Sequence, residues 1–196
     1  MKKYLVLIAV SLLSGCTLLY SSTQLSQLDA PKSLKHNSKH YYLNFQKDLD
    51  SVARYVYFEK KESSSNWKSA VELLLDRNEE ERSLAERIAL RKRVYKNTGV
   101  EHFDLYEQDN TLYAFVIYPP SEQHNNWQVN VAKGKDVDDC GFVQYQYSLK
   151  IPKTKKMMNM GKVKLIGYLK KYVVDKELQK MSKAKWQWGC KNKDAQ

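Results

Sequence analysis

Residues 140–151 constrain the fold most, because apolar and polar side chains alternate along them. From Val143 to Ile151 every second residue is apolar, and glutamine, serine and lysine fill the positions between. Successive side chains of a β-strand point to opposite faces of its sheet. The pattern therefore predicts a strand of an antiparallel sheet, with one face buried and the other in water.

Further strands are predicted on both sides of this one. Six segments have the composition or alternation of strands: residues 41–45, 52–58, 102–107, 111–118, 127–131 and 186–190. The last of these is read as an edge strand or an extended tail. Residues 67–76 hold an apolar run that suits either a helix or a buried strand, and we expect a strand that pairs with residues 52–58.

Two helices are predicted. Residues 79–96 begin with three glutamates and end in basic residues, an order that complements the helix dipole, and Gly99 supplies a stop. Residues 161–181 carry apolar side chains at the helical period, and Glu177 occupies the next position of that period. The expected fold class is α+β: an antiparallel sheet of about five to six strands with two main helices packed on one face.

The first sixteen residues have the organisation of an export signal. Lys2 and Lys3 precede an apolar run from Tyr4 to Leu13, and small residues follow it. The alternative is the start of a membrane-spanning helix, which needs about 20 mainly apolar residues. Ser11 and Ser14 interrupt this run early, so a cleaved signal is favoured.

Leu13-Ser14-Gly15-Cys16 resembles the lipobox of bacterial lipoprotein precursors. The resemblance implies cleavage before Cys16, a diacylglycerol thioether on its sulfur and an amino group acylated by a chain such as palmitate. Inner-membrane lipoproteins of enteric-type bacteria tend to carry aspartate at the next position, so Thr17 favours the periplasmic face of the outer membrane. The expected organisation is a signal peptide (1–15), a lipidated flexible tether (16–40), one globular domain (41–190) and a frayed tail (191–196).

Cys140 and Cys190 remain once Cys16 is assigned to the lipid. In an oxidising compartment the economical interpretation is one disulfide. It would close a loop of about 50 residues and stabilise the fold by about 4 kcal/mol in the chain-entropy model. Two free thiols or an intermolecular bond are the alternatives, and the spacing lacks the paired cysteines of a zinc site.

The excess positive charge is concentrated at the C-terminal end. The whole precursor carries +11, and residues 150–196 alone hold fourteen lysines, no arginine and three acids. Lysine is a hydrated point charge with little geometric specificity, so such a surface suits loose contact with an anionic surface. The alternative is that it only keeps the protein soluble. The candidate contact residues are Lys153, Lys155, Lys156, Lys162, Lys164, Lys170 and Lys171.

The sequence offers no recognisable catalytic, cofactor or metal motif. His36 and His40 have the spacing of helical metal ligands, but they fall in the expected tether. Asp136, Asp138 and Asp139 suit a solvated turn better than a cation site. Trp127, Trp186 and Trp188 suit a carbohydrate or peptide groove or, more simply, a core.

These features favour a lipid-anchored periplasmic interaction protein that is not an enzyme and has no cofactor. In layout it is similar to immunity-type lipoproteins and to accessory lipoproteins of envelope machines, with a periplasmic protein as the expected partner. The alternative is an envelope-structural lipoprotein whose lysine face contacts lipopolysaccharide, phospholipid or peptidoglycan. An enzyme with a site made of scattered residues is a third reading. Nucleic acid is not an expected partner in this compartment, and the sequence predicts no oligomeric state.

Overall fold

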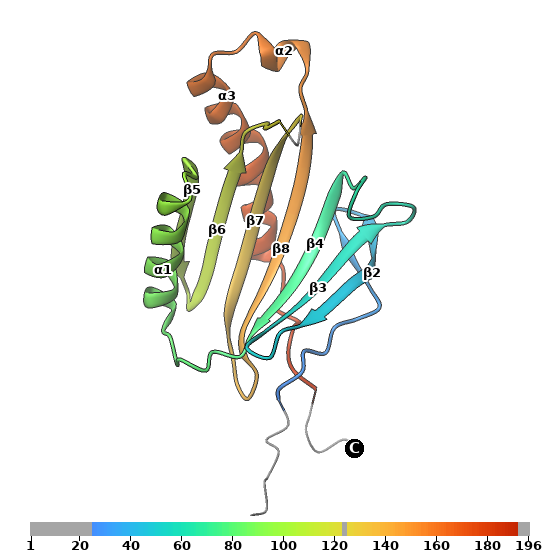
Figure 1. Cartoon of the computed structure of the whole chain (residues 1–196), viewed down its shortest axis with the longest axis vertical. Coiled ribbons are helices and arrows are strands. Elements are labelled where there is room, and N and C mark those ends of the chain that lie inside the picture. The colour runs from blue at the N-terminus through green and yellow to red at the C-terminus, as the bar shows by residue number, and fades with distance from the viewer. Residues whose placement is uncertain (1–24, 123–124, 192–196) are drawn as a thin grey trace, which may run out of the picture.

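The computed structural model describes residues 25–122 and 125–191, and Figure 1 shows their arrangement. Eight strands form one sheet: β1 (Ser33–His36), β2 (Lys39–Asp48), β3 (Val52–Glu59), β4 (Ser69–Asp76), β5 (His102–Gln108), β6 (Thr111–Tyr118), β7 (Asn126–Val137) and β8 (Gly141–Pro152). The helical segments are α1 (Leu84–Asn97), α2 (Lys155–Met158), α3 (Lys162–Leu169), the π-helical turn η1 (Lys170–Val174) and α4 (Asp175–Lys183).

The sheet consists of two antiparallel meanders joined at their last strands. Its order is β1-β2-β3-β4-β8-β7-β6-β5, and every neighbouring pair is antiparallel. The central β4–β8 pair brings together residues about seventy positions apart, as in Leu73 opposite Tyr145. The sheet curls into a half-barrel (Figure 1).

The predicted fold class is wrong in two respects. The sheet has eight strands rather than five to six, and the main helices lie on opposite faces of the sheet rather than on one. On β6, Leu112 and Ala114 pack in the cluster with Leu84 and Ile88 of α1, whereas the alternate residues pack in the cluster that contains α3 and α4. We call these the α1 face and the α4 face. Helical periodicity shows which side of a helix is apolar, but it does not show which side of a sheet that helix covers.

The strand that constrained the fold alternates as predicted, but both of its faces are covered in part. Tyr145 and Tyr147 of β8 pack on the α4 face. Phe142 and Gln144 point to the other face, and both are buried there rather than in water. The guanidinium groups of Arg87 and Arg91 from α1 lie near the Phe142 ring. Gly134 leaves room for the Phe142 ring, because a Cβ at position 134 would lie 2.5 Å from Phe142 Cζ.

The strand predicted over residues 67–76 forms as β4 and pairs with β3 as expected. The first helix begins later than predicted, because a capping box sets its start: Ser83 is the N-cap, and the side chain of Glu86 accepts a hydrogen bond from its backbone. Residues 79–81 therefore precede the helix. The second predicted helix forms as a continuous helical stretch from α3 through η1 to α4.

The folded unit begins earlier than the expected tether boundary at residue 40. Leu28 is only 2% exposed and forms a bridge with Cys190, and β1 pairs with β2 through a two-residue turn at Asn37 and Ser38. Residues 28–40 therefore belong to the domain and not to a tether. Their polar composition gave no sign of a strand in the sequence. Residues 186–190 form an irregular segment rather than an edge strand, since their bridge is confined to Cys190.

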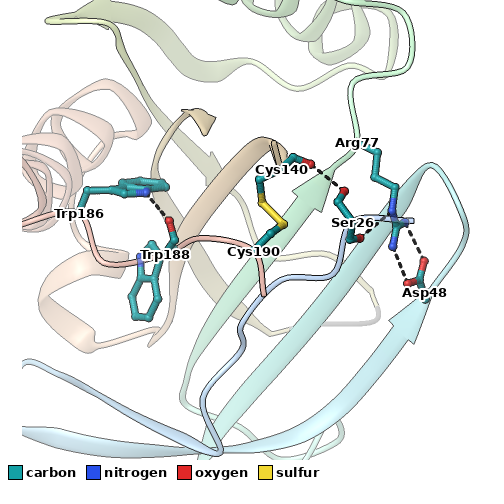
Figure 2. The surroundings of a disulfide bond; sticks show 7 residues. All are labelled: Ser26, Asp48, Arg77, Cys140, Trp186, Trp188 and Cys190. Carbon is teal, nitrogen blue, oxygen red and sulfur yellow. Dashed lines mark hydrogen bonds and ion pairs between the residues drawn. A yellow bond between two sulfur atoms is a disulfide. The ribbon is translucent and has the colours of Figure 1, made fainter. Parts of the chain in front are cut away.

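The predicted disulfide is present. Cys140, in the β7–β8 turn, bonds to Cys190 with an S–S distance of 2.07 Å and a Cα–Cα distance of 5.3 Å. Figure 2 shows the surroundings, where Ser26 Oγ donates to the carbonyl oxygen of Cys140 and Arg77 Nε donates to the carbonyl oxygen of Ser26. The start and end of the described chain are thus tied to the same turn. Across 25–122 and 125–191, every helix falls short of the length and apolarity needed to cross a membrane.

Candidate functional site

A cavity of about 240 Å³ opens on the α4 face, where four separate parts of the chain meet. Its lining comes from the β1–β2 hairpin, β7, β8, and α4 with the segment that follows it: Lys35, His36, Asn37, Lys133, Tyr145, Lys180, Met181, Ala184, Lys185, Gln187 and Trp188. Four of these residues are lysines and none is acidic. The cavity is therefore strongly basic.

Lys133 is the most unusual of these lysines, because it is only 5% exposed. It lies opposite Tyr145 in the β7–β8 register. Its ammonium group donates to the carbonyl oxygens of Met181 at 3.0 Å and Ala184 at 2.7 Å, at the C-terminal end of α4. Burial lowers the pKa of Lys133, and the positive charge of Lys135 lowers it further.

A hydrogen-bonded chain crosses one wall of the cavity. The hydroxyl of Tyr145 lies 2.7 Å from His36 Nδ1, and His36 Nε2 lies 3.2 Å from Glu177 Oε2. A carboxylate only accepts hydrogen bonds, so Nε2 carries a proton and, in the neutral imidazole, Nδ1 accepts from the tyrosine hydroxyl. The carboxylate of Glu177 also accepts from the side chains of Asn37 and Lys180.

These contacts control the ionisation of the buried carboxylate. Burial alone would raise the pKa of Glu177, but the hydrogen bonds from His36, Lys180 and Asn37 outweigh it and lower the pKa to about 2. Burial raises the pKa of the Tyr145 hydroxyl above its ordinary value. Glu177 is therefore anionic at neutral pH, and Tyr145 is neutral. Both ring nitrogens of His36 are already in use.

Three aromatic rings complete this region. Trp188 stacks on Tyr145 with an interplanar angle of 4° and ring centroids 5.5 Å apart. The ammonium groups of Lys133 and Lys135 lie 5.7 and 5.6 Å from the ring centroid of Trp186. Figure 2 shows the indole nitrogen of Trp186 donating to the carbonyl oxygen of Trp188. The disulfide at Cys190 fixes this segment against the sheet.

The seven lysines predicted as a contact surface divide into two groups. Lys153, Lys155, Lys156, Lys162 and Lys164 are exposed on the segment from residue 153 to 164, which we call the tip. In Figure 1 the tip lies at the opposite end of the molecule from the two ends of the described chain. Lys170 and Lys171 lie on η1, where their ammonium groups approach the rings of Phe115 and Tyr172.

The tip also exposes two apolar side chains. Met158 is 63% exposed and Val163 is 88% exposed. Lys162 forms an ion pair of 2.7 Å with Glu101, and residues 150–174 contain no acid of their own. The tip therefore combines exposed apolar side chains with a local excess of positive charge.

The other predicted site residues take different places. Cys16 and the lipobox lie outside the described residues. His36 belongs to the cavity wall, and His40 is exposed on β2. Asp136 is exposed near the end of β7, Asp138 and Asp139 are exposed in the β7–β8 turn, and among the described residues no group of three metal-ligating side chains gathers.

Sequence reasoning missed Lys133, although a signal for it was available. Trp127, Val129 and Val131 occupy the inward positions of β7, and continuing their alternation places Lys133 inward as well. The alternation along β7 therefore predicts that Lys133 is buried. Glu177 falls at the next position of the helical period in the sequence, and in the structure it is buried. What neither pattern shows is that the two residues lie near one cavity.

A family model matches residues 28–186, which include all eight strands and most of the cavity lining. The chain belongs to this family. It is 43% identical over 196 residues to a protein of Haemophilus influenzae (strain Rd) described as "Uncharacterized protein", with 97% of this chain and 99% of the relative covered. No solved structure matches.

Proposed function

We propose that this protein is an exported, lipid-anchored protein of the cell envelope that acts by binding an acidic surface of a periplasmic protein. The observation that supports this most directly is the tip, where Met158 and Val163 stand exposed among five lysines. Apolar contact would supply affinity, and the lysines would steer an acidic partner and set its orientation.

The anchor rests on the N-terminal sequence. Lys2 and Lys3, the apolar run and Leu13-Ser14-Gly15-Cys16 support cleavage and lipidation at Cys16, and Thr17 supports the outer membrane. The disulfide between Cys140 and Cys190 suits an oxidising compartment. Nine residues, 16–24, precede the described chain, and a stretch of that length reaches at most about 30 Å when extended.

The position of the tip favours a protein partner over the anchoring membrane. The described chain begins at one end of the molecule, and the tip lies at the other (Figure 1). A protein held through its N-terminal end would present the tip away from its own bilayer. The lysines of the tip would then meet periplasmic components rather than the headgroups around the anchor.

Binding suits the chemistry of the cavity better than catalysis does. Glu177 accepts hydrogen bonds from three side chains, and His36 uses one nitrogen for Glu177 and the other for Tyr145. A general base needs a lone pair that can reach a substrate proton. Here the chain of contacts already satisfies these groups, as in a structural network.

Site-specific photo-crosslinking from Val163 in living cells tests the proposed partner. We expect one crosslinked protein of defined stoichiometry, which is lost when Lys155→Glu and Lys156→Glu reverse the charge of the tip. The matched control is Lys60→Glu with Lys61→Glu, two exposed lysines of the β3–β4 turn; it should leave the crosslink unchanged.

Other outcomes would contradict this proposal. Crosslinks to many proteins, together with salt-sensitive binding to peptidoglycan or lipopolysaccharide, would favour an envelope-structural role, in which lysines act as unspecific point charges. The anchor has its own test: Cys16→Ser should give an unprocessed precursor or a protein that no longer fractionates with membranes. Normal membrane fractionation of that variant would disprove lipidation at Cys16.

A further inference from the structure

We propose that the basic cavity on the α4 face binds a small organic anion, with its carboxylate or phosphate at Lys133 and a flat apolar body against Trp188. The cavity is separate from the tip, so the anion site and the proposed protein partner are tested independently. Lys133, Tyr145 and Trp188 all line the same cavity, and they come from β7, β8 and the segment after α4.

The unpaired charge of Lys133 is the first step of the argument. Lys133 is 5% exposed, and its two hydrogen-bond acceptors are neutral backbone carbonyl groups. An ammonium has three N–H donors, so one remains for another acceptor. No carboxylate among the described residues forms an ion pair with Lys133. A buried charge is costly unless it is paired, and an anion in the cavity would supply that pair.

The surrounding charges favour the same ligand class. Lys35 and Lys185 line the cavity and are exposed at its edge. The ammonium of Lys180 is occupied by Glu177 and Asn37, so it neutralises the nearby carboxylate. After this pairing, Lys35, Lys133 and Lys185 leave the cavity with a net positive charge. Such a cavity attracts anions and repels cations.

The size and the rings restrict the ligand further. The volume of about 240 Å³ is smaller than the range of roughly 300–1,000 Å³ that is usual for drug-sized ligands. The stacked pair of Trp188 and Tyr145 offers a flat surface for an apolar group. Lysine does not discriminate strongly between carboxylate and phosphate, because it acts as a point charge rather than a fork. The expected ligand is therefore small and amphipathic, and carries at least one negative charge.

A purely structural role is the competing explanation for Lys133. Cationic side chains near the C-terminal end of a helix satisfy its last carbonyl groups and interact favourably with its dipole. That role predicts that removal of the charge destabilises the fold and leaves ligand binding unaffected. An anion site predicts the reverse, because Lys133→Met would replace an unpaired buried charge with an apolar side chain of similar length.

The experiment is calorimetric titration of the purified, disulfide-bonded protein with benzoate, phenyl phosphate and benzamide, monitored in parallel by indole fluorescence. Benzamide has nearly the shape of benzoate but no charge. We expect at least one of the two anions to bind roughly 10- to 100-fold more tightly than benzamide, the range for a hydrogen bond to a charged group. Equal affinity for all three, or no binding of either anion, would overturn the proposal.

Variants locate the site. The Lys133→Met variant should bind the anions no more tightly than benzamide, so that the preference of roughly 10- to 100-fold disappears. Its circular-dichroism spectrum and melting temperature should match those of the parent protein. Unchanged anion binding in Lys133→Met would overturn the assignment. If Lys133→Met does not fold, Lys35→Gln and Lys185→Gln decide the question. These exposed lysines should each weaken anion binding about two- to five-fold, whereas Lys183→Gln, outside the lining, should have no effect; no change in either edge variant would also refute the site.

Discussion

Each face of the sheet buries a cationic side chain, and the groups that surround the two cations differ. On the α1 face Arg87 is 3% exposed, and its guanidinium pairs with the carboxylate of Asp76, donates to Asn78 and lies 4.1 Å from the centre of the Phe142 ring. On the α4 face Lys133 is 5% exposed; its ammonium donates to two neutral carbonyl groups and lies 5.7 Å from the centre of the Trp186 ring, and no carboxylate of the described residues pairs with it.

The difference separates a structural charge from an available one. The guanidinium of Arg87 has a carboxylate, an amide oxygen and an aromatic face around it, so its charge is compensated within the fold. Lys133 borders a cavity and has carbonyl groups and an aromatic ring but no carboxylate around it among the described residues, so the anion that we propose would supply its only counter-ion there. Two buried cations of similar exposure therefore point to opposite roles, and the surroundings of each charge decide which role applies.

The largest effect should come from breaking the compensated pair. Asp76→Ala leaves Arg87 buried without its counter-ion, and loss of one partner of a buried pair costs about 3–5 kcal/mol of unfolding free energy. Urea denaturation measures it. The double variant Asp76→Ala with Arg87→Met should recover much of the loss, because it removes both charges.

The matched control is Glu80→Ala, which breaks the more exposed ion pair between Glu80 and Arg82. Exposed pairs contribute only about 0–1 kcal/mol, so this variant should unfold almost as the parent protein does. If Asp76→Ala were no more destabilising than Glu80→Ala, Arg87 would not be a structural charge, and the contrast between the two faces would disappear.

The disulfide provides the next effect, and it acts mainly on the α4 face. The segment with Trp186 and Trp188 closes this face and is held at Cys190. Reduction, or Cys140→Ser with Cys190→Ser, should cost about 2–5 kcal/mol. Melting curves with and without reductant measure the loss, and indole fluorescence should report a rearranged segment. Equal melting temperatures would show that noncovalent contacts alone close the α4 face.

A smaller effect should follow acidification, because the α4 face also holds a carboxylate of low pKa. The pKa of Glu177 is about 2 in the fold against 4.5 as its reference value. The stabilisation from its ionised form is therefore complete above pH 4.5 and is lost as the pH falls toward 2. Glu177→Gln should cost about 1–3 kcal/mol near neutral pH and should flatten this part of the pH profile.

The control for this profile is Glu107→Gln, since Glu107 is exposed on the edge strand β5. Its acid denaturation should follow that of the parent protein. If Glu177→Gln and the parent protein lost stability in parallel between pH 4.5 and 2, the hydrogen bonds to Glu177 would not be the source of the acid sensitivity.

Local patterns in the sequence predicted the elements that depend on local chemistry. Alternation predicted β8, strand composition predicted β5 and β6, and cysteine counting predicted the Cys140–Cys190 bond. The capping box at Ser83 and Glu86 was present in the sequence but was outweighed by the preceding acidic run. Boundaries were therefore less accurate than the elements themselves.

Long-range packing decided what could not be predicted. The sequence around β1 is polar, and its strand character comes from pairing with β2 and from Leu28 packing against the C-terminal segment. The two helices have apolar sides, but only the three-dimensional order of β5 to β8 assigns them to opposite faces. The cavity is likewise lined by residues from position 35 to position 188. No local sequence pattern indicates that such distant residues lie together.

Because Lys185, Gln187 and Trp188 lie between α4 and Cys190, the last-synthesised part of the described domain builds one wall of the cavity. A nascent polypeptide lacks that wall, and a thiol-reducing environment leaves the wall without the disulfide that holds it. If the cavity binds an anion as we propose, binding would begin only after the whole domain is synthesised and Cys140 and Cys190 are oxidised.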